Sequence, residues 1–436
     1  MRQNAFFKWP ACLAVLCSLL GFLNLIPAFA AKAQKPNVIL ILADDLGWTD
    51  LACYGSDFYE TPHLDQLARD GMKFIQAYSA CTVCSPTRAA LLTGRHGARK
   101  WHLGNEEQYP ENHGSDLNVA GSFGSGPPSY FAPYRISTLP DGPKGEYVTD
   151  RLADEAARFI AAHKDEPFFL YWPHFAVHTP IQGKPALVEK YKAKLRPGQA
   201  QTNAVYAAMV ESLDDAVGRM RRTLNELKLS ERTIIIFGSD NGGRVPTTSN
   251  LPLRVGKGSC YEGGTRVPFI VHWPGVTAPG SVCDTPVISM DVFPTVLEMT
   301  GLKKSARGPV DGLSLVPLLR QSGKLKRDTL FWHYPHYQHY QLGGTTPYGA
   351  IRAGDFKLLE FFDDMRVELY NLRDDLGEQR NLAAEMPDKA AELRKRLHAW
   401  RKEVGAQMPS PNPAYDPSKP EHDPATRQKK PVKKGA

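Results

Sequence analysis

Residues 38–45 read Val-Ile-Leu-Ile-Leu-Ala-Asp-Asp, an apolar run that ends in two carboxylates. A run this short that is apolar at every position predicts a strand buried on both faces, because a half-solvated strand alternates apolar with polar residues. Similar runs occur at Phe168–Trp172, Thr233–Phe237 and Phe269–Val271. Together they predict the strands of one large buried sheet.

Helical spacing of apolar residues separates these runs, at Pro62–Asp70, Thr149–Lys164 and Asn203–Leu227. Strands that alternate with helices predict an α/β fold, in which a large mostly parallel sheet is sandwiched by helices. We expect this domain to cover residues 31–325. Short strands near 350–352, 356–359 and 367–370, followed by a helix at 387–404, predict a small C-terminal antiparallel sheet with one helix, as a subdomain at 326–406.

Polar residues follow three of the predicted strands. Asp44-Asp45 ends the first run, His174 and His178 follow the second, and Asp240-Asn241 follows the third. Because the carboxyl ends of parallel strands meet at one edge, where α/β proteins bind ligands, we expect these groups to converge. The oxygen atoms of Asp44, Asp45, Asp240 and Asn241 suit Ca²⁺ or Mg²⁺ rather than Zn²⁺. An Asp pair by itself could equally cap a helix.

The segment Cys84-Ser85-Pro86-Thr87-Arg88 predicts the start of a helix, since proline favours the first turn. Cys84 would then lie at a helix N-terminus, where free N–H groups and the helix dipole attract an anion. Arg88, one turn later, can point at the same anion. A structural cysteine, or one bonded to Cys81, explains the local pattern equally well. The chain without its first 30 residues keeps an odd number of cysteines, and Cys84 is our candidate for the unpaired or modified one.

Further candidates for chemistry are basic or imidazole side chains: His178, Lys257, Lys100 and His102. Lys257 stands between two glycines, which let the backbone approach a ligand closely. Each is a weak signal alone. Together with the predicted metal ligands they indicate a pocket for an anionic ester.

The N-terminus is typical of a signal peptide. Arg2 and Lys8 precede the apolar stretch 11–26, and Ala28-Phe29-Ala30 is a small-x-small cleavage site. We therefore expect residues 1–30 to be removed from an exported protein, periplasmic or secreted, that keeps no membrane span. An uncleaved anchor is the alternative.

The net charge of +7 is concentrated at the two ends of the chain. The predicted signal peptide and the proline-rich segment 407–436 are both basic, whereas the body between them is close to neutral. We therefore expect a disordered tail at 407–436 and no nucleic-acid partner.

In combination, the motifs resemble those of the type I, formylglycine-dependent sulfatases of the alkaline-phosphatase superfamily, which include the arylsulfatases. The resemblance extends to about Val404 and rests on the segments 36–48, 84–94, 100–104, 237–242 and 256–268. Its most specific part is Cys-x-Pro-x-Arg followed by Leu-Leu-Thr-Gly.

This resemblance implies a nucleophile and a metal. A maturation enzyme would oxidise Cys84 to formylglycine, whose hydrated aldehyde attacks the sulfur of a sulfate ester. One Ca²⁺ would be held by the following residues: Asp44, Asp45, Asp240, Asn241 and the modified residue 84. The implied substrates are aryl sulfates or sulfated carbohydrates.

The resemblance also assigns roles to the basic side chains. Arg88 and Lys100 would hold the formylglycine and the developing charge. His178 and Lys257 would stabilise or protonate the leaving alcohol. His102 would accept the proton that lets sulfate depart.

One departure from the family lies just before Lys100. In the family, several dozen residues with a helix and a strand normally separate the end of the Cys84 signature from the motif that contains Lys100. Here only a few residues, ending at Arg99, separate them, as if a deletion lay between Arg99 and Lys100. Gly94–Arg99 could still return Lys100 to the site, because six extended residues span about 20 Å. A shortened sheet edge is expected. The alternatives to an active sulfatase are a phosphonate or phosphodiester hydrolase of the same superfamily and an inactivated product.

The stretch Phe331–Tyr340 is dense in aromatic and imidazole side chains. Such groups stack on sugar rings, but they also fill hydrophobic cores, and the sequence leaves both readings open.

Overall fold

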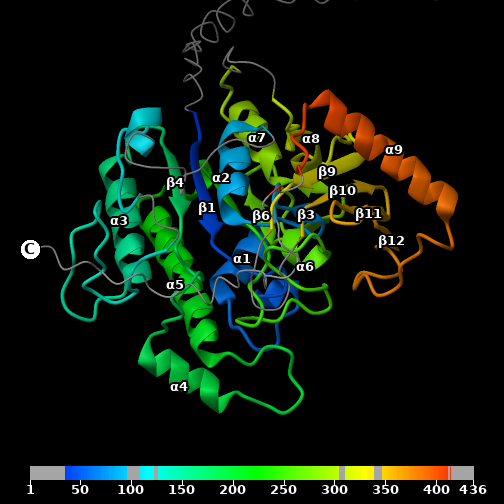
Figure 1. Cartoon of the computed structure of the whole chain (residues 1–436). Helices are drawn as coiled ribbons and strands as arrows, with labels where there is room; N and C mark the ends of the chain where they lie inside the picture. Colours follow the sequence, from blue (N-terminus) through cyan, green and yellow to red (C-terminus); the bar gives the residue numbers. More distant parts are fainter. Residues whose placement is uncertain are drawn as a thin grey trace, which may run out of the picture. The chain divides into compact units, whose positions relative to one another are not determined.

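The predicted large sheet is present in the computed structural model, which describes residues 35–95, 109–121, 126–303, 310–337, 346–410 and 413 (Figure 1). All its strands belong to the unit that runs from Pro36 to Ala436. The strand order is β4-β1-β5-β6-β2-β7. The strands are β1 (Asn37–Ala43), β2 (Met72–Phe74), β4 (Phe169–Pro173), β5 (Thr233–Ser239), β6 (Phe269–His272) and β7 (Ser281–Cys283).

The sheet is mixed and mostly parallel, as predicted. β1 pairs in parallel with β4 on one side and with β5 on the other. β6 pairs antiparallel with both β5 and β2, and β2 pairs in parallel with β7. Because β1, β4 and β5 run in the same direction, the polar residues that follow them lie at one edge. β6 runs the other way, so His272 at its end lies at the opposite edge.

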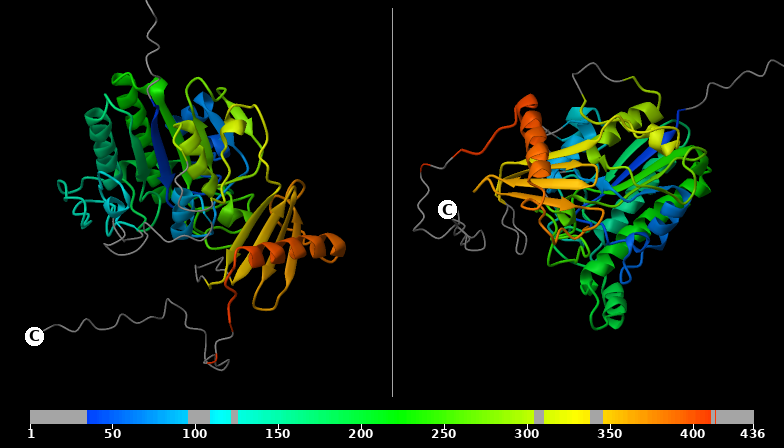
Figure 2. Two further views of the ribbon diagram at one scale, coloured as in Figure 1. Left: turned by 90° about the horizontal axis from the view of Figure 1, so that it is seen from above. Right: turned by 90° about the vertical axis from the view of Figure 1, so that its right-hand side faces the viewer.

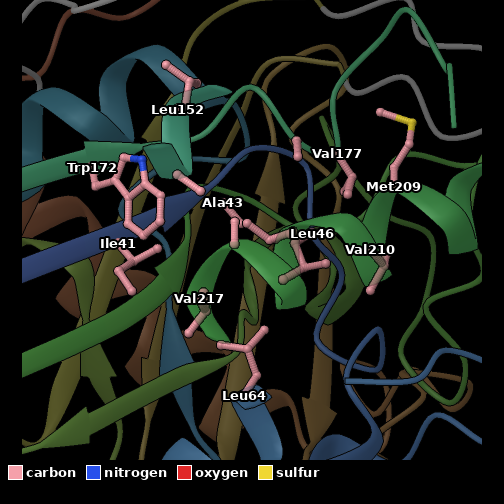
Figure 3. Close-up of a cluster of buried hydrophobic side chains, with 14 of the residues drawn as sticks. Ile41, Ala43, Leu46, Leu64, Leu152, Trp172, Val177, Met209, Val210 and Val217 are labelled. Carbon is pink, nitrogen blue, oxygen red and sulfur yellow. The ribbon is translucent and has the colours of Figure 1, made fainter. Parts of the chain in front are cut away.

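Helices cover both faces of the sheet. The bounds of these helices are α1 (Pro62–Asp70), α2 (Cys84–Thr93), α3 (Val148–Ala162), α5 (Ala204–Glu226), α7 (Val292–Met299) and α8 (Val316–Leu319), and α4 (Pro185–Ala193) packs on α5. Successive residues of β1 point to opposite faces. Ile39, Ile41 and Ala43 pack with α1, α3 and α5 (Figure 3). Val38 and Leu40 pack with α2, α7 and α8 on the other face.

The edge strand β4 departs from the expected burial. Within the described residues it is the terminal strand of the sheet, and Phe169 is 50% exposed. The prediction that Phe168–Trp172 is buried on both faces is therefore wrong for most of this run. Helices cover the end of a sheet less completely than its centre, so side chains there stay partly in water.

The C-terminal subdomain is a four-stranded antiparallel sheet with one helix. Its strand order is β12-β11-β10-β9, and α9 (Pro387–Glu403) packs on one face (Figure 2). The strands are β9 (Thr329–Tyr334), β10 (Tyr348–Ala353), β11 (Phe356–Phe361) and β12 (Val367–Asn371). The other face of the sheet packs against Tyr78, Cys81 and Ala90 of the large domain.

The fourth strand of this sheet, β9, comes from the aromatic stretch that the sequence left unassigned. Trp332 and Tyr334 alternate inward to the core shared with the large domain. Phe331 stacks on Trp400 of α9, with ring centroids 4.8 Å apart and planes at 6°. The structure thus places the first half of the stretch in a core, while Tyr337 is 54% exposed.

Two short strands and a short helix complete the region beside the large sheet. They are β3 (Ala77–Tyr78), its parallel partner β8 (Val287–Ile288), and α6 (Glu262–Thr265).

Among the described residues, no disulfide joins the cysteines at 53, 81, 84, 260 and 283. In the same part of the chain, none of the helices combines the length and the apolarity needed to cross a bilayer. The predicted signal peptide and nearly all of the predicted tail lie outside the described residues.

A buried ionic cluster joins the two sheets. Lys357 of β11 lies 2.9 Å from Glu262 of α6 and 3.1 Å from Glu378, and all three side chains are almost fully buried. Tyr78 and Arg266 also contact Glu262. Burial raises the pKa of Glu262, but the positive charges around it outweigh burial and lower the pKa to about 2. Glu262 is therefore ionised and depends on its cationic partners.

Replacing Lys357 with Met should lower the free energy of unfolding by about 3–5 kcal/mol, because two buried carboxyl groups lose their shared ammonium partner. The matched control is Lys192→Met, which breaks an exposed pair with Glu189 and should change stability by less than about 1 kcal/mol. Denaturant unfolding of both variants measures the difference. Equal effects of the two substitutions would contradict a structural role for the buried cluster.

Candidate active site

The ends of β1 and β5 bring the predicted metal ligands together. The strands pair up to Ala43 and Ser239, and the next residues leave the sheet side by side. The Asp45 N–H lies 3.2 Å from Asp240 Oδ1, and the Asn241 side-chain amide donates to Asp45 Oδ1 at 2.8 Å. Residues 195 or more positions apart thus form one group. The convergence that the two Asp-containing motifs predicted is present.

The backbone at this edge adopts conformations that few residues tolerate. Asp45 has φ of 62°, in the left-handed region that a non-glycine residue occupies only when its surroundings hold it there. Gly242 follows Asn241, and a Cβ atom at this position would overlap the carbonyl oxygen of Gly263. Glycine therefore lets the start of the loop after β5 lie directly on α6, the short helix that follows this loop and the Lys257 that it carries.

Helix α2 supplies Cys84 and Arg88 from the face of the sheet. The helix begins at Cys84, two residues earlier than a helix opening at Pro86 would begin. Arg88 lies one turn along and bridges two carboxylates: Nη2 is 3.0 Å from Asp44 Oδ2 and 2.7 Å from Asp240 Oδ2. The ligand atoms of Cys84, Asp44 and Asp240 lie within 4.8 Å of one another. The helix start predicted only that Cys84 lies at a helix N-terminus, and the family resemblance implied its place beside Asp44 and Asp240.

Negative charge dominates the electrostatics of this cluster. Burial and the neighbouring charge of Asp240 raise the pKa of Asp44 well above its usual value, and the opposing charge of Arg88 does not offset them. Burial, with the charges of Asp44 and Asp240, also raises the pKa of the Cys84 thiol to about 12. In both cases the neighbouring carboxylates add to the effect of burial, and the charges of Arg88 and Lys257 do not offset the sum.

Three oxygen atoms fit a bound cation. Asp44 Oδ1, Asp45 Oδ2 and Asn241 Oδ1 are buried and have no hydrogen-bond partner among the described residues. A buried unpaired oxygen is unfavourable unless a partner satisfies it. Carboxylate and amide oxygens are the ligands that hard divalent cations prefer. The donor set therefore fits Ca²⁺ or Mg²⁺.

Lys257 and His178 lie on the Asp45 side of the cluster. Lys257 Nζ is 2.5 Å from Asp45 Oδ1, and His178 Nε2 is 3.7 Å from Asp45 Oδ2. Burial raises the pKa of Asp45, but the charges of Lys257 and His178 outweigh it and the pKa is lowered. Burial in turn lowers the pKa of His178. The structure brings both predicted basic residues to the site.

Three other predicted residues differ in outcome. Lys100 and His102 lie outside the described residues. His174 is buried at the end of β4 with its ring 4.4 Å from Trp172, and burial lowers its pKa to about 3. His174 is therefore neutral. Within the described part of the chain, two groups of ligand atoms could hold a metal, and neither includes His174: Asp44, Asp45 and His178, and Asp44, Cys84 and Asp240.

Sequence reasoning missed Asp50, which supports the loop after β1. Its carboxylate accepts hydrogen bonds from the Gly47 N–H, the Tyr206 hydroxyl and the Thr248 hydroxyl at 2.6–2.8 Å. Tyr206 also donates to the Asp45 carbonyl oxygen at 3.2 Å. Tyr206 comes from α5 and Thr248 from the loop after β5, so no local pattern around Asp50 reveals these two partners.

Comparisons with protein families agree with this geometry. The family profile described as Sulfatase matches residues 36–112 and 95–302, and the profile described as N-sulphoglucosamine sulphohydrolase, C-terminal, matches residues 255–404. A sulfatase of Formosa agariphila is 33% identical over 81% of this chain and 85% of its own length. The N-acetylgalactosamine-6-sulfatase of Homo sapiens is 32% identical over 69% of this chain and 68% of its own.

Solved structures share the architecture. Ps i-CgsB in complex with k-i-k-neocarrahexaose superposes with a TM-score of 0.71 and 27% identity, covering 84% of this chain and 93% of that one. The phosphonate monoester hydrolase of Agrobacterium radiobacter superposes with a TM-score of 0.63 and 20% identity, covering 85% and 96%. The second likeness is one of fold alone.

Adding Ca²⁺ to chelator-treated protein should raise its thermal midpoint, because the ion satisfies the buried oxygens only in the folded state. At a free concentration of about 100 times Kd the stabilisation is about 2.7 kcal/mol. Asn241→Ala should lose most of this shift, whereas Asn225→Ala, at an exposed position of α5, should keep it. The measurement is the midpoint with and without Ca²⁺ for each variant. An undiminished shift in Asn241→Ala would place the ion elsewhere.

Proposed function

The chain belongs to the sulfatase family of the alkaline-phosphatase superfamily and is a sulfuric ester hydrolase, and we propose that it cleaves sulfate esters of carbohydrates at the Cys84 site. The observation that carries this proposal is the convergence of Cys84, Arg88 and Lys257 on one buried group of carboxylates. Fixed positive groups in a buried site stabilise the charge that develops on the oxygens of a transferring sulfuryl group.

We propose that a maturation enzyme converts Cys84 into formylglycine. Hydration of that aldehyde would provide one hydroxyl oxygen to attack sulfur and a second hydroxyl whose deprotonation lets sulfate leave. The first turn of α2 supports this role, because its N–H groups and dipole favour negative charge at residue 84. Arg88, held by Asp44 and Asp240, adds a fixed cation one turn away.

Ca²⁺ is the ion we propose for Asp44, Asp45, Asp240 and Asn241, with the modified residue 84 as a further ligand. The buried unpaired oxygens of three of these residues support the assignment. When bound, the ion would polarise the nucleophile and the sulfate oxygens as a Lewis acid. The protein's own part is to orient these ligands, which it does through the Asp50 and Arg88 contacts.

His178 and Lys257 are the proposed partners of the leaving alcohol. His178 Nδ1 lies 2.9 Å from the Thr179 carbonyl oxygen, so Nδ1 carries a hydrogen and Nε2 faces the site. Protonation of Nε2 would make the imidazole cationic, and this proton would pass to the ester oxygen as the S–O bond breaks. Lys257 adds positive charge beside the same oxygen. Lys100, as a second holder of charge with Arg88, and His102, as the base for sulfate release, remain proposals.

Sulfated carbohydrates are the proposed substrate class. One relative is named for N-acetylgalactosamine-6-sulfate, and one structural neighbour was solved with a neocarrahexaose. Export through a signal peptide at residues 1–30 to the periplasm or the exterior would place the enzyme where such polymers occur. The catalytic domain would span 31–325 and the C-terminal subdomain 326–406.

Co-expression with a maturation enzyme should place an aldehyde at residue 84, detected by mass spectrometry of its peptide, and the matured protein should release sulfate from a panel of sulfated sugars. Arg88→Lys should lower kcat/KM by about 10²–10³-fold, because a single ammonium cannot bridge both carboxylates while stabilising developing charge. Arg158→Lys, at an exposed position of α3, should leave kcat/KM unchanged.

Three outcomes would count against parts of this proposal. An unmodified thiol in an active preparation would remove the formylglycine nucleophile. Faster turnover of aryl phosphonates than of any sulfate ester would favour phosphonate hydrolysis. A cooperative fold that binds Ca²⁺ but turns over neither substrate class would indicate that the shortened junction at Arg99 has inactivated the enzyme.

A further inference from the structure

The loop that carries His178 is held by a tyrosine from outside it. Tyr130 is fully buried, and its hydroxyl lies 2.6 Å from the Phe175 carbonyl oxygen and 2.9 Å from the His178 carbonyl oxygen. The His178 N–H also donates to the Phe175 carbonyl oxygen, which closes a turn between these residues. The Tyr130 hydroxyl therefore spans both ends of the turn that presents His178.

The orientation of the His178 ring depends on the same stretch of backbone. Its Nδ1 lies 2.9 Å from the carbonyl oxygen of Thr179, the next residue. The Thr179 carbonyl belongs to the next peptide plane, which shares the Thr179 Cα with the plane of the His178 carbonyl that Tyr130 contacts, so a shift of the first plane displaces the second. A rotation of that plane would move the acceptor of Nδ1 and change which ring nitrogen carries the hydrogen.

The segment around Tyr130 lies close against the loop. A Cβ atom at Gly126 would be 2.6 Å from the Thr179 carbonyl oxygen and 3.1 Å from His178 Nδ1. The Tyr130 N–H donates to the Gln182 side chain at 2.8 Å. The ring of Tyr130 stacks on Tyr147, whose hydroxyl donates to the Gln182 carbonyl oxygen at 2.7 Å.

We propose that Tyr130 is a positioning residue that holds His178 with Nε2 directed at the leaving group. The inference rests on the proposed role of His178 and extends it to a residue that touches neither the substrate nor the metal. Tyr130 would thereby determine how well the enzyme cleaves esters of poor leaving groups, such as sugar alcohols, which need a proton as the S–O bond breaks.

The test compares two substrates in matured enzyme: a sulfated sugar and 4-nitrophenyl sulfate, whose leaving group needs no proton. Tyr130→Phe should lower kcat on the sugar sulfate by about 10–100-fold, since a small misplacement of a catalytic group has effects of this size. On 4-nitrophenyl sulfate the change should stay within about 3-fold. Tyr147→Phe is the matched control. Tyr147 stacks on Tyr130, and its hydroxyl donates to the same loop, but at Gln182, four residues after His178. The variant should therefore change turnover of both substrates by the same factor.

Two further measurements separate positioning from a general loss of structure. Tyr130→Phe added to His178→Ala should have no extra effect, because the group that Tyr130 orients is gone. At a pH where the ring is neutral, the ¹⁵N spectrum of labelled histidine, with His178 assigned by its absence in His178→Ala, should show the Nδ1–H tautomer in the parent and a mixture in Tyr130→Phe.

Some outcomes would overturn the inference and others the role on which it rests. Equal losses on both substrates, additivity with His178→Ala, or an unchanged His178 tautomer in Tyr130→Phe would each refute a positioning role for Tyr130. If His178→Ala itself lowered turnover of both substrates equally, the proposed role of His178 as proton donor would be wrong. This result comes from the His178→Ala variant alone and does not depend on Tyr130.

Discussion

The structure depends on a group of carboxylates that must be buried without enough positive charge beside them. Asp44, Asp45 and Asp240 leave the ends of two adjacent parallel strands, and burial with mutual repulsion raises the pKa of Asp44. Arg88 offsets part of this charge, and Lys257 offsets another part from the opposite side. The remaining unpaired oxygens fit a divalent cation, so the charge imbalance of the cluster is also what would bind the metal.

The rest of the domain keeps these charges in place. Close contact between Gly242 and Gly263 packs the start of the loop after β5, which carries Lys257, against α6. That loop continues into α6, where Glu262 is tied to Lys357 of the C-terminal sheet. The C-terminal subdomain is therefore connected to the site through a buried ion pair, and the aromatic side chains of β9 add hydrophobic contact across the same boundary.

One edge of the large sheet is only partly covered. Within the described residues β4 ends the sheet with Phe169 half exposed, and the sequence predicts a shortened junction before Lys100. Arg88, the carboxylates, Lys257 and His178 are nevertheless assembled, because they come from β1, α2, β5 and the loops after β4 and β5. The core of the site is thus built from elements that the shortened junction does not include.

The sequence by itself determined the alternation of strands and helices, the ligands at the ends of β1 and β5, and the start of α2 near Cys84, because each leaves a local pattern of burial or helix geometry. Only the tertiary structure decided that β4 is an edge strand, that the Phe331 stretch forms β9 in a core, and that Asp50 and Tyr130 support the loops of the site. Their partners lie tens to hundreds of residues away, and contacts of that kind arise from packing, which leaves no periodic signal in a single sequence.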